Sequence, residues 1–372
     1  MAGLTPLERS ALLVIAVLTA LAGVANYQAW AAVPRFAVAT FALAGLAWVV
    51  SFATEQLGER FGPGVTGMMQ STLGNLPELF VVIFALQKGE LVVAQTAIIG
   101  SVLANALLVL GLVIVVGARR SPDGMMRFSK RLPRDTATLL QVTVFIIVLL
   151  GLSLAAHDPA SHHVDGISIV GAICLLVVYM TWVVPYLRSD RLAGAGEVAA
   201  EVVEAASQPG VPAEAEPRGP RLSLWLTLVL LVVAGTASAF VSDWFVNGLE
   251  PAISILHISQ AFAGLVIVAI AGNAVENTAG LMLAYKRRSD LAISVVKNSV
   301  AQIAAFLFPA LVLLSFALKT TLTFALAPVY IGALALTALA LWQVTGDGEA
   351  AEFEGWALVS LYVILAALTL YE

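Results

Sequence analysis

The chain has 372 residues, of which 60% are hydrophobic and only 12% charged, and its mean hydropathy is +0.94. A soluble domain cannot leave this much apolar surface in water, so the composition excludes a soluble protein and indicates one that lies in a lipid bilayer. The formal net charge of −5 says less than the side of the membrane on which each charge falls.

Apolar segments of about the length that a bilayer requires recur along the whole sequence. We predict an all-α polytopic membrane protein of about eleven transmembrane helices, built as an inverted repeat of two five-helix halves after one extra N-terminal helix. The first segment is also compatible with a signal peptide, because Ala29-Trp30-Ala31 resembles a cleavage site. The predicted spans are residues 10–28, 35–55, 63–87, 91–117, 135–155, 165–187, 221–243, 258–285, 290–317, 321–343 and 355–371.

The distribution of Lys and Arg predicts the orientation of these spans. When the loops are assigned alternately to the two sides, fifteen of these cations fall on the side of the N-terminus and three on the other, while Lys297 lies inside a span. Cytoplasmic loops carry the excess of Lys and Arg. We therefore expect a multi-pass protein of a bacterial-type cytoplasmic (inner) membrane, with a cytoplasmic N-terminus and an external C-terminus.

The longest polar segment, 188–220, divides the chain nearly in half. It mixes Ala and Pro with glutamates, which is typical of a solvated cytoplasmic linker. The spacing of Glu197, Glu201 and Glu204 also allows a short acidic helix. The predicted units are an extra helix in 1–30, a first repeat in 31–187, the linker in 188–220 and a second repeat in 221–372.

One motif occurs twice. Gly74-Asn75-Leu76-Pro77-Glu78 lies in the third span and Gly272-Asn273-Ala274-Val275-Glu276 in the eighth, and the same displacement of 198 residues carries Ser101 onto Ser299. Because five spans separate the copies, one runs outward where the other runs inward, as in the inverted repeats of secondary transporters. Glu78 and Glu276 are therefore expected to face each other near the membrane midplane.

These motifs predict an ion site. A carboxylate inside a membrane is costly and by default indicates function. The Gly-Asn pairs weaken the helices, and Pro77 removes a backbone hydrogen bond, so carbonyl oxygens become free to bind an ion. The candidate ligands are all oxygen donors, with the glycines acting through the backbone: Glu78, Glu276, Asn75, Asn273, Gly74, Gly272, Ser101, Ser299, Asn105 and Gln302.

The ligand types favour calcium, which takes roughly 6–8 oxygen ligands. Zinc or copper would require the Cys or His that the spans lack except near their ends, and the one cysteine, Cys174, has no partner. His157, His162 and His163 lie in an outer loop, where either an external metal site or a solvated loop is possible. Since one divalent cation or protons can neutralise a carboxylate pair, competition for one site would produce antiport.

At these residues the chain resembles the calcium/cation antiporter superfamily, and most closely its cation/proton exchanger branch, over nearly its whole length. Further matches are Gly100-Ser101 with Asn105, Ser299 with Gln302-Ile303-Ala304, and Glu354-Gly355-Trp356. The resemblance implies eleven helices, an acidic linker, and exchange of calcium for protons by alternating access with Glu78 and Glu276 as shared ligands.

The chain departs from that pattern at three positions. Many family members have His at the position of Asn277 and Gly at that of Asn298, so proton coupling or selectivity can differ here. Lys297 lies about seven residues into the ninth span, where it either extends toward the cytoplasmic surface or approaches the two glutamates and modulates the site. The second possibility favours an alternative function, the exchange of sodium or potassium for protons on the same fold.

Other classes of function have less support. The G-x-x-x-x-G-K-[ST] loop of ATP-driven pumps is absent from the sequence, so we expect a gradient-driven transporter and neither an enzyme nor a protein with a cofactor. A membrane scaffold or receptor would have no use for paired buried acids, and a channel is disfavoured by the inverted repeats. The basic loop 119–134 suggests nucleic acid or anionic lipid, but the topology explains it without nucleic acid. The expected partners are calcium ions, protons and the bilayer, and the oligomeric state stays open.

Overall fold

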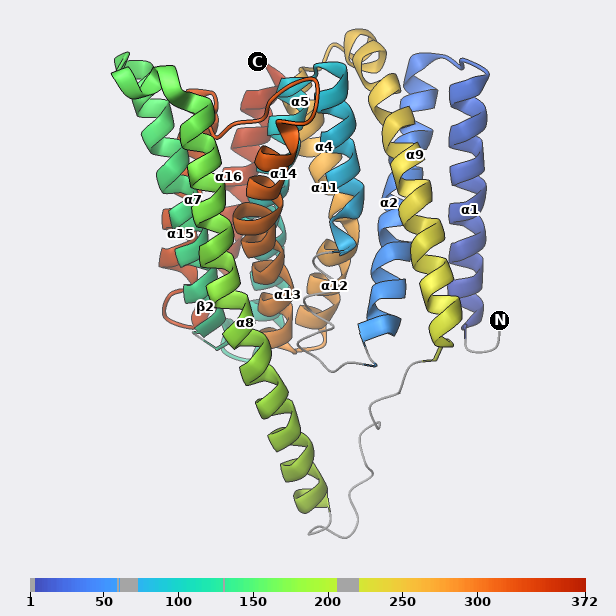
Figure 1. Cartoon of the computed structure of the whole chain (residues 1–372). Coiled ribbons are helices and arrows are strands. Elements are labelled where there is room, and N and C mark those ends of the chain that lie inside the picture. The colour runs from blue at the N-terminus through green and yellow to red at the C-terminus, as the bar shows by residue number, and fades with distance from the viewer. Residues whose placement is uncertain (1–3, 59, 61–72, 130, 206–220) are drawn as a thin grey trace.

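A computed structural model describes residues 4–58, 60, 73–129, 131–205 and 221–372, and for residues 58, 131–133, 186–205, 275 and 276 it describes the backbone alone. Figure 1 shows the helices side by side in one bundle, with the N-terminus at its lower face and the C-terminus at its upper face. Termini on opposite faces agree with an odd number of spans. By the distribution of Lys and Arg, the lower face is the one predicted to be cytoplasmic.

The first part of the chain supplies the spans up to the linker. Segments η1, η3 and η4 of the whole chain are π-helical, whereas η2 is a short 3-10 helix. The elements are α1 (Pro6–Tyr27), α2 (Ala32–Gly58), α4 (Leu76–Lys88), α5 (Leu91–Leu103), η1 (Ala104–Val109), α6 (Leu110–Arg120), β1 (Met125–Arg127), α7 (Arg131–Ala156), η2 (Pro159–His163) and α8 (Val164–Ala205).

The second part repeats this pattern of long and interrupted helices. Its elements are α9 (Leu224–Leu256), α10 (Gln260–Phe262), η3 (Ala263–Val268), α11 (Ala269–Gly272), α12 (Ala274–Tyr285), α13 (Ser289–Gln302), η4 (Ile303–Leu307), α14 (Phe308–Ser315), α15 (Pro328–Thr345), β2 (Glu349–Ala351) and α16 (Glu352–Leu370).

Nine of the described helices are long and apolar enough to cross a membrane, and the bent pair Gln260–Gly272 and Asn277–Tyr285 makes a tenth. The remaining predicted span, 63–87, is described only from residue 73 onward, so its first half lies outside the described residues. The polytopic all-α fold is therefore as predicted. The spans Leu91–Arg120 and Ser289–Ser315 are the most enclosed, with 89% and 72% of their most apolar stretches buried. They carry Ser101, Asn105, Ser299 and Gln302.

Local sequence signals set several helix ends. Thr5 and Glu8 form a capping box at the start of α1, with Pro6 in the first turn. Gly89 ends α4 in the left-handed conformation, with φ of 89°, which a residue without a Cβ adopts freely. Ser223 caps α9 by accepting a hydrogen bond from the amide of Leu226.

Two predicted helix boundaries are wrong. The helix expected to end at 243 continues as α9 to Leu256, because the apolar sequence goes on past Asp243. The helix expected from 321 starts only at Pro328, since β-branched Thr residues precede it and Pro fixes the first turn. The segment before it is held by Ser315, whose Oγ accepts from the Leu322 amide at 2.8 Å.

The predicted linker is partly helical. Helix α8 passes through Pro185 and continues to Ala205, so the backbone at Glu197, Glu201 and Glu204 follows the acidic-helix alternative. In Figure 1 this part of α8 extends below the bundle. Residues 206–220 lie outside the described residues.

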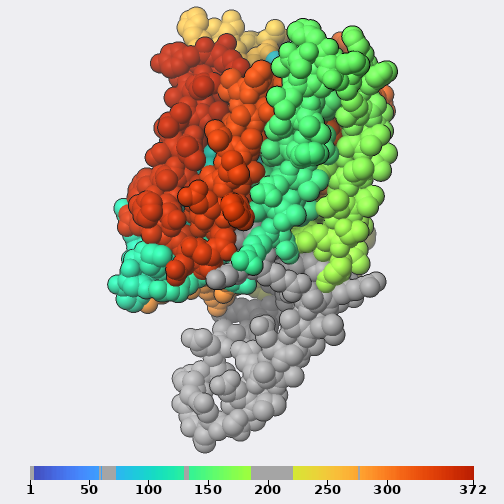
Figure 2. All heavy atoms as spheres, turned by 90° about the vertical axis from the view of Figure 1, so that its left-hand side faces the viewer, coloured from blue at the N-terminus to red at the C-terminus, as the bar shows by residue number. Residues whose placement is uncertain are grey.

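A two-stranded ribbon, which the sequence analysis did not predict, joins two loops at the lower face. Strands β1 and β2 pair antiparallel, with Met126 opposite Ala350. Figure 2 shows the teal loop that carries β1 against the red C-terminal helices at this end. Above the ribbon, α6 and α16 cross at Gly111 and Gly355, where a Cβ on either glycine would lie 2.6 Å from the carbonyl oxygen of the other.

This crossing supports a stability prediction. Gly111→Ala is expected to lower the free energy of unfolding by about 1–3 kcal/mol, because the added methyl meets backbone that cannot move aside. Thermal unfolding in detergent measures the effect. Gly166→Ala in α8 is the control, since a Cβ there meets open space. Equal unfolding midpoints for the two variants would contradict the prediction.

Candidate ion-binding site

Glu78 lies inside the bundle, in the first turn of α4. The helix is interrupted at Asn75, and α4 begins at Leu76 with Pro77 in its first turn. Only 4% of Glu78 is exposed. A carboxylate in a first helical turn lies near the positive end of the helix dipole, which reduces the cost of a negative charge within the membrane.

The second motif also breaks its helix. Helix α11 ends at Gly272 and α12 begins at Ala274, and the two parts of this span differ in direction by 56°. Glu276 follows in the first turn of α12. Its side chain is not among the described ones, so the pairing of the two glutamates stays a prediction.

Glu78 accepts hydrogen bonds from both halves of the chain. Ser101 Oγ on α5 donates to Glu78 Oε1 at 2.6 Å. Asn273 Nδ2, at the break between α11 and α12, donates to the same oxygen. Ser101 and Asn273, two of the candidate ligands, thus contact Glu78 from the two halves of the chain.

The network extends to the ninth span. Asn105 Nδ2 donates to Asn273 Oδ1 at 2.8 Å and to Ser299 Oγ at 3.0 Å. Asn105 and Asn273 are fully buried, and Ser101 and Ser299 are each 1% exposed. Five polar side chains from four spans thus form one connected cluster: Glu78, Ser101, Asn105, Asn273 and Ser299.

Two buried side-chain oxygens beside this cluster lack hydrogen-bond donors in the described structure, namely Asn105 Oδ1 and Gln302 Oε1. A buried acceptor without a partner costs free energy, so such atoms usually have a water or an ion nearby. Amide and carboxylate oxygens are the ligands that hard cations such as Ca²⁺ and Na⁺ take. The donor set therefore fits a hard cation.

The glycine of the second motif provides space for Glu78. A Cβ on Gly272 would lie 2.6 Å from Glu78 Cγ and 2.7 Å from Oε1. Gly100, next to Ser101, allows α5 to lie close to η3, because a Cβ there would be 2.5 Å from Cα of Leu265. Gly272 thus permits the contact between the two motifs in addition to weakening its helix.

Both spans that follow a motif contain a π-helical turn. Segment η1 begins one residue before Asn105, and η4 begins one residue after Gln302. Such turns are frequent at functional sites, because they leave carbonyl groups without their usual partners and redirect side chains. Thr143 Oγ1 of α7 donates to the Ala304 carbonyl in η4 at 3.2 Å. In η3, the Leu265 carbonyl accepts from Tyr362 OH at 3.2 Å.

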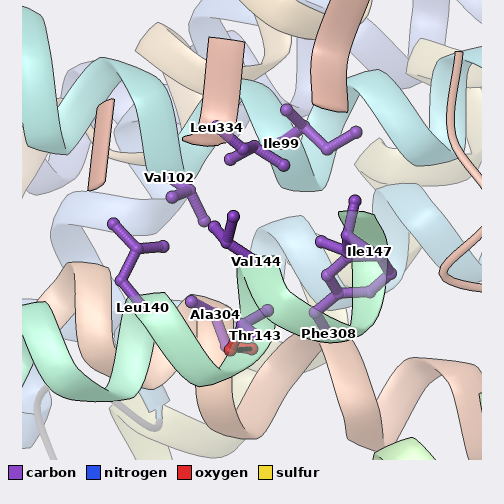
Figure 3. Close-up of a pocket in the computed structure, with 9 residues that line it drawn as sticks. All are labelled: Ile99, Val102, Leu140, Thr143, Val144, Ile147, Ala304, Phe308 and Leu334. Atoms are coloured by element: carbon purple, nitrogen blue, oxygen red, sulfur yellow. Dashed lines mark hydrogen bonds between the residues drawn. The ribbon is translucent and has the colours of Figure 1, made fainter. Parts of the chain in front are cut away.

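A small cavity lies beside η4, but it is not the ion site. Its lining is apolar apart from Thr143, and it includes Val102, Val144 and Phe308 (Figure 3). Its volume of about 10 Å³ leaves room for one water at most. A cavity of this size and polarity cannot hold a hydrated cation.

Lys297 is buried beside the end of α15, and its predicted approach to the two glutamates stays a prediction because the Glu276 side chain is not described. Its side chain is fully buried, so the ammonium does not extend to the cytoplasmic surface. Its Nζ donates to Thr345 Oγ1 at 2.9 Å, at the last residue of α15. Residues 297 and 299 are about 200° apart around α13, so Lys297 points away from the side on which Ser299 contacts the cluster. The C-terminal turn of α15 favours a cation, because a helix dipole is negative at that end.

Thr345 supplies the hydrogen bond that makes this buried amine tolerable. We expect Thr345→Val to lower the free energy of unfolding by about 1–3 kcal/mol, because the amine loses its acceptor. Lys297→Met should be neutral or stabilising, and the double variant should regain most of the loss. Thermal unfolding of all three variants tests this, and an additive double variant would contradict it.

Acidic residues also gather at the upper face. Glu90, in the turn before α5, accepts a hydrogen bond from Gln260 Nε2 at 2.9 Å. Burial raises the pKa of Glu90, and the nearby Glu250 raises it further. Asp243 of α9 pairs with Lys88 at 2.8 Å.

The structure thus unites five of the ten predicted ligand residues. Asn75 and Gln302 are buried, and no hydrogen bond from either to the cluster is seen among the described side chains. Gly74 and Gly272 lie next to the helix breaks. The sequence analysis missed Thr345 and the π-helical turns. It also missed Ser242 of α9, which donates to the Pro77 carbonyl at 3.4 Å. A sequence pattern that marks these positions is not evident.

Comparison with known proteins gives consistent matches. The family model described as sodium/calcium exchanger protein matches residues 31–186 and 226–371. A Ca(2+)/H(+) antiporter of Synechocystis sp. is 30% identical over 361 residues, 95% of each chain. The Ca(2+)/H(+) antiporter ChaA of Bacillus subtilis is 27% identical over 91% of this chain and 92% of its own length. The solved structure of native YfkE shares the fold, with a TM-score of 0.77 at 24% identity, over 97% of this chain and 100% of YfkE.

Proposed function

Because the chain belongs to the sodium/calcium exchanger protein family, we propose that this multi-pass membrane transporter exchanges calcium for protons. The relatives from Synechocystis sp. and Bacillus subtilis are named for this exchange. The observation that carries the proposal is the Glu78 carboxylate, which is buried between the two halves and accepts hydrogen bonds from Ser101 and Asn273.

The cluster has groups for both states of such a site. With the ion absent, Ser101 and Asn273 donate to Glu78 and hold its carboxylate in place. With calcium bound, a hydroxyl can rotate its proton away and offer a lone pair, and the amide oxygens of Asn105 and Gln302 can complete the shell. Glu78 and Glu276 would supply the negative charge, which protons neutralise when the ion leaves.

The two halves would provide alternating access. We assign residues 31–187 and 221–372 to the two exchanger repeats, and the two segments that match the family model support this division. Glu78 and Asn105 come from the first repeat and Asn273 and Ser299 from the second. A shift of one repeat against the other would therefore open the cluster to one face at a time.

We place this protein in the cytoplasmic membrane, with its lower face inside. The excess of Lys and Arg in the loops of that face supports this orientation, as does its similarity to bacterial relatives. A peptide tag at the N-terminus should be cleaved by protease in everted vesicles but not in intact cells. The opposite pattern would reverse the orientation.

Proton-driven calcium uptake tests the function. The native chain is reconstituted in liposomes with an imposed pH gradient, and the flux of calcium, sodium and potassium is measured separately. We expect calcium uptake that collapses when a protonophore removes the gradient. If calcium stays outside while sodium or potassium moves, the alternative monovalent cation/proton exchange holds and the calcium assignment fails.

A further inference from the structure

Four exposed cations gather at the lower face from segments far apart in the sequence. Arg120 ends α6, and its guanidinium lies over the ring of Tyr285 at 4.5 Å from the ring centre. The turn between α12 and α13 follows this tyrosine directly, and Figure 1 shows these two helices ending together at the lower face. We call the group the basic corner, and it consists of Arg120, Lys286, Arg287 and Arg288.

The basic corner differs from the neighbouring cations in having no acidic partner. Among the described residues, no carboxylate lies within 4.0 Å of these four side chains. Arg119, by contrast, pairs with Glu352 at 2.7 Å, and Arg127 pairs with Asp123 at 2.6 Å. The nearby Asp290 is engaged elsewhere, because its Oδ1 accepts from the Ser129 amide at 2.6 Å.

Arg287 occupies a backbone conformation that favours glycine. Its φ is +59°, and the amides of Arg287 and Arg288 donate to the carbonyls of Ala284 and Leu283 as in a Schellman motif. A residue with a Cβ is strained in this left-handed conformation. Strained residues are commonly retained where a side chain contacts a ligand, so the charge at 287 points to a binding role.

Apolar side chains flank the basic corner on the membrane side. Three apolar side chains at the adjoining ends of α12 and α13 are about half exposed: Met282 at 51%, Tyr285 at 56% and Leu291 at 50%. Cations at headgroup depth beside apolar side chains at acyl-chain depth match a phospholipid. A nucleic acid or an acidic peptide would leave these apolar groups without a partner.

We propose that the basic corner binds the phosphate of an anionic phospholipid in the adjacent leaflet, with the acyl chains against Met282, Tyr285 and Leu291. Such a lipid would join the end of α6 to the turn between α12 and α13. Asn273 of the polar cluster directly precedes α12, and Ser299 lies in the last turn of α13. Bound lipid therefore stabilises the arrangement of the second half of the site.

Native mass spectrometry of the full chain in detergent tests this without any transport assay. Phosphatidylglycerol and phosphatidylcholine are titrated separately, and we expect tight retention of phosphatidylglycerol alone. Each neutralised cation should weaken its binding by about fivefold. Arg120→Gln removes one charge, and Arg119→Gln, the neighbouring but paired cation, is the control that should bind as the native chain does.

Arg287→Gly separates binding from folding, because the two effects have opposite signs. Glycine relieves the strained backbone, so the thermal midpoint in detergent should rise or stay equal while phosphatidylglycerol binding falls about fivefold. Equal loss in Arg119→Gln, or equal binding of phosphatidylcholine, would overturn the proposal. Displacement of the lipid by millimolar inorganic phosphate would likewise overturn it in favour of a free anion site.

Discussion

Glu78→Gln is expected to abolish proton-driven calcium uptake in liposomes. The amide keeps the volume of the carboxylate, and its carbonyl oxygen can still accept from Ser101 and Asn273, but the negative charge that would bind the cation is removed. Loss of one partner from a buried charged pair costs roughly 3–5 kcal/mol. That corresponds to a fall of about 10²–10⁴-fold in affinity.

Two further variants show whether charge is the cause. Glu78→Asp keeps the carboxylate one methylene further back, so it should retain measurable uptake with weaker apparent affinity. Asp165→Asn neutralises an exposed acid at the start of α8 and should transport as the native chain does. Native rates in Glu78→Gln would show that calcium binds elsewhere.

Gly272→Ala is expected to reduce uptake by about 10²-fold without unfolding the protein. Its methyl would lie 2.6 Å from Glu78 Cγ, so the carboxylate must move from its position between Ser101 and Asn273. A displacement of about 1 Å at a reacting or binding group can cost this much in rate. Uptake rates, together with thermal unfolding, measure the two effects separately.

The control and the compensating variant make this prediction specific. Gly332→Ala, in α15, adds a methyl where a Cβ meets open space and should change neither property much. Glu78→Asp in the Gly272→Ala background shortens the crowded side chain and should recover part of the lost uptake. Strictly additive losses would contradict direct contact between the two positions.

The repeat explains why so much of the site could be predicted from the sequence. Each copy of G-N-x-x-E is followed at the same spacing by a serine, Ser101 or Ser299. This pattern indicates two helix breaks, buried glutamates and nearby serine hydroxyls. Glu78 and Ser101 do meet. Periodicity and composition also predict a polytopic helical fold, because the bilayer permits few other arrangements.

The rest depends on contacts that local patterns do not encode. The partner of Lys297 is Thr345, 48 residues away on another helix, and β1 pairs with a strand more than 200 residues later. Two of the π-helical segments, η4 and η3, accept hydrogen bonds from Thr143 and Tyr362 on neighbouring helices. Helix α9 continues past Asp243 because apolar residues resume beyond it, which a boundary placed at the first polar residues misses.

The polar cluster also constrains how the protein can be made. Asn273 is synthesised 195 residues after Glu78, the carboxylate it contacts. At translation rates of about 5–20 residues per second, this interval lasts roughly 10–40 s. During that time Glu78 lacks the hydrogen bond from Asn273, and Asn105 lacks Asn273 and Ser299, the two acceptors it contacts in the folded protein. Until the second half is inserted, the polar side chains of the first half therefore lack some of their hydrogen-bond partners. In that interval they contact lipid, water or an insertion factor instead.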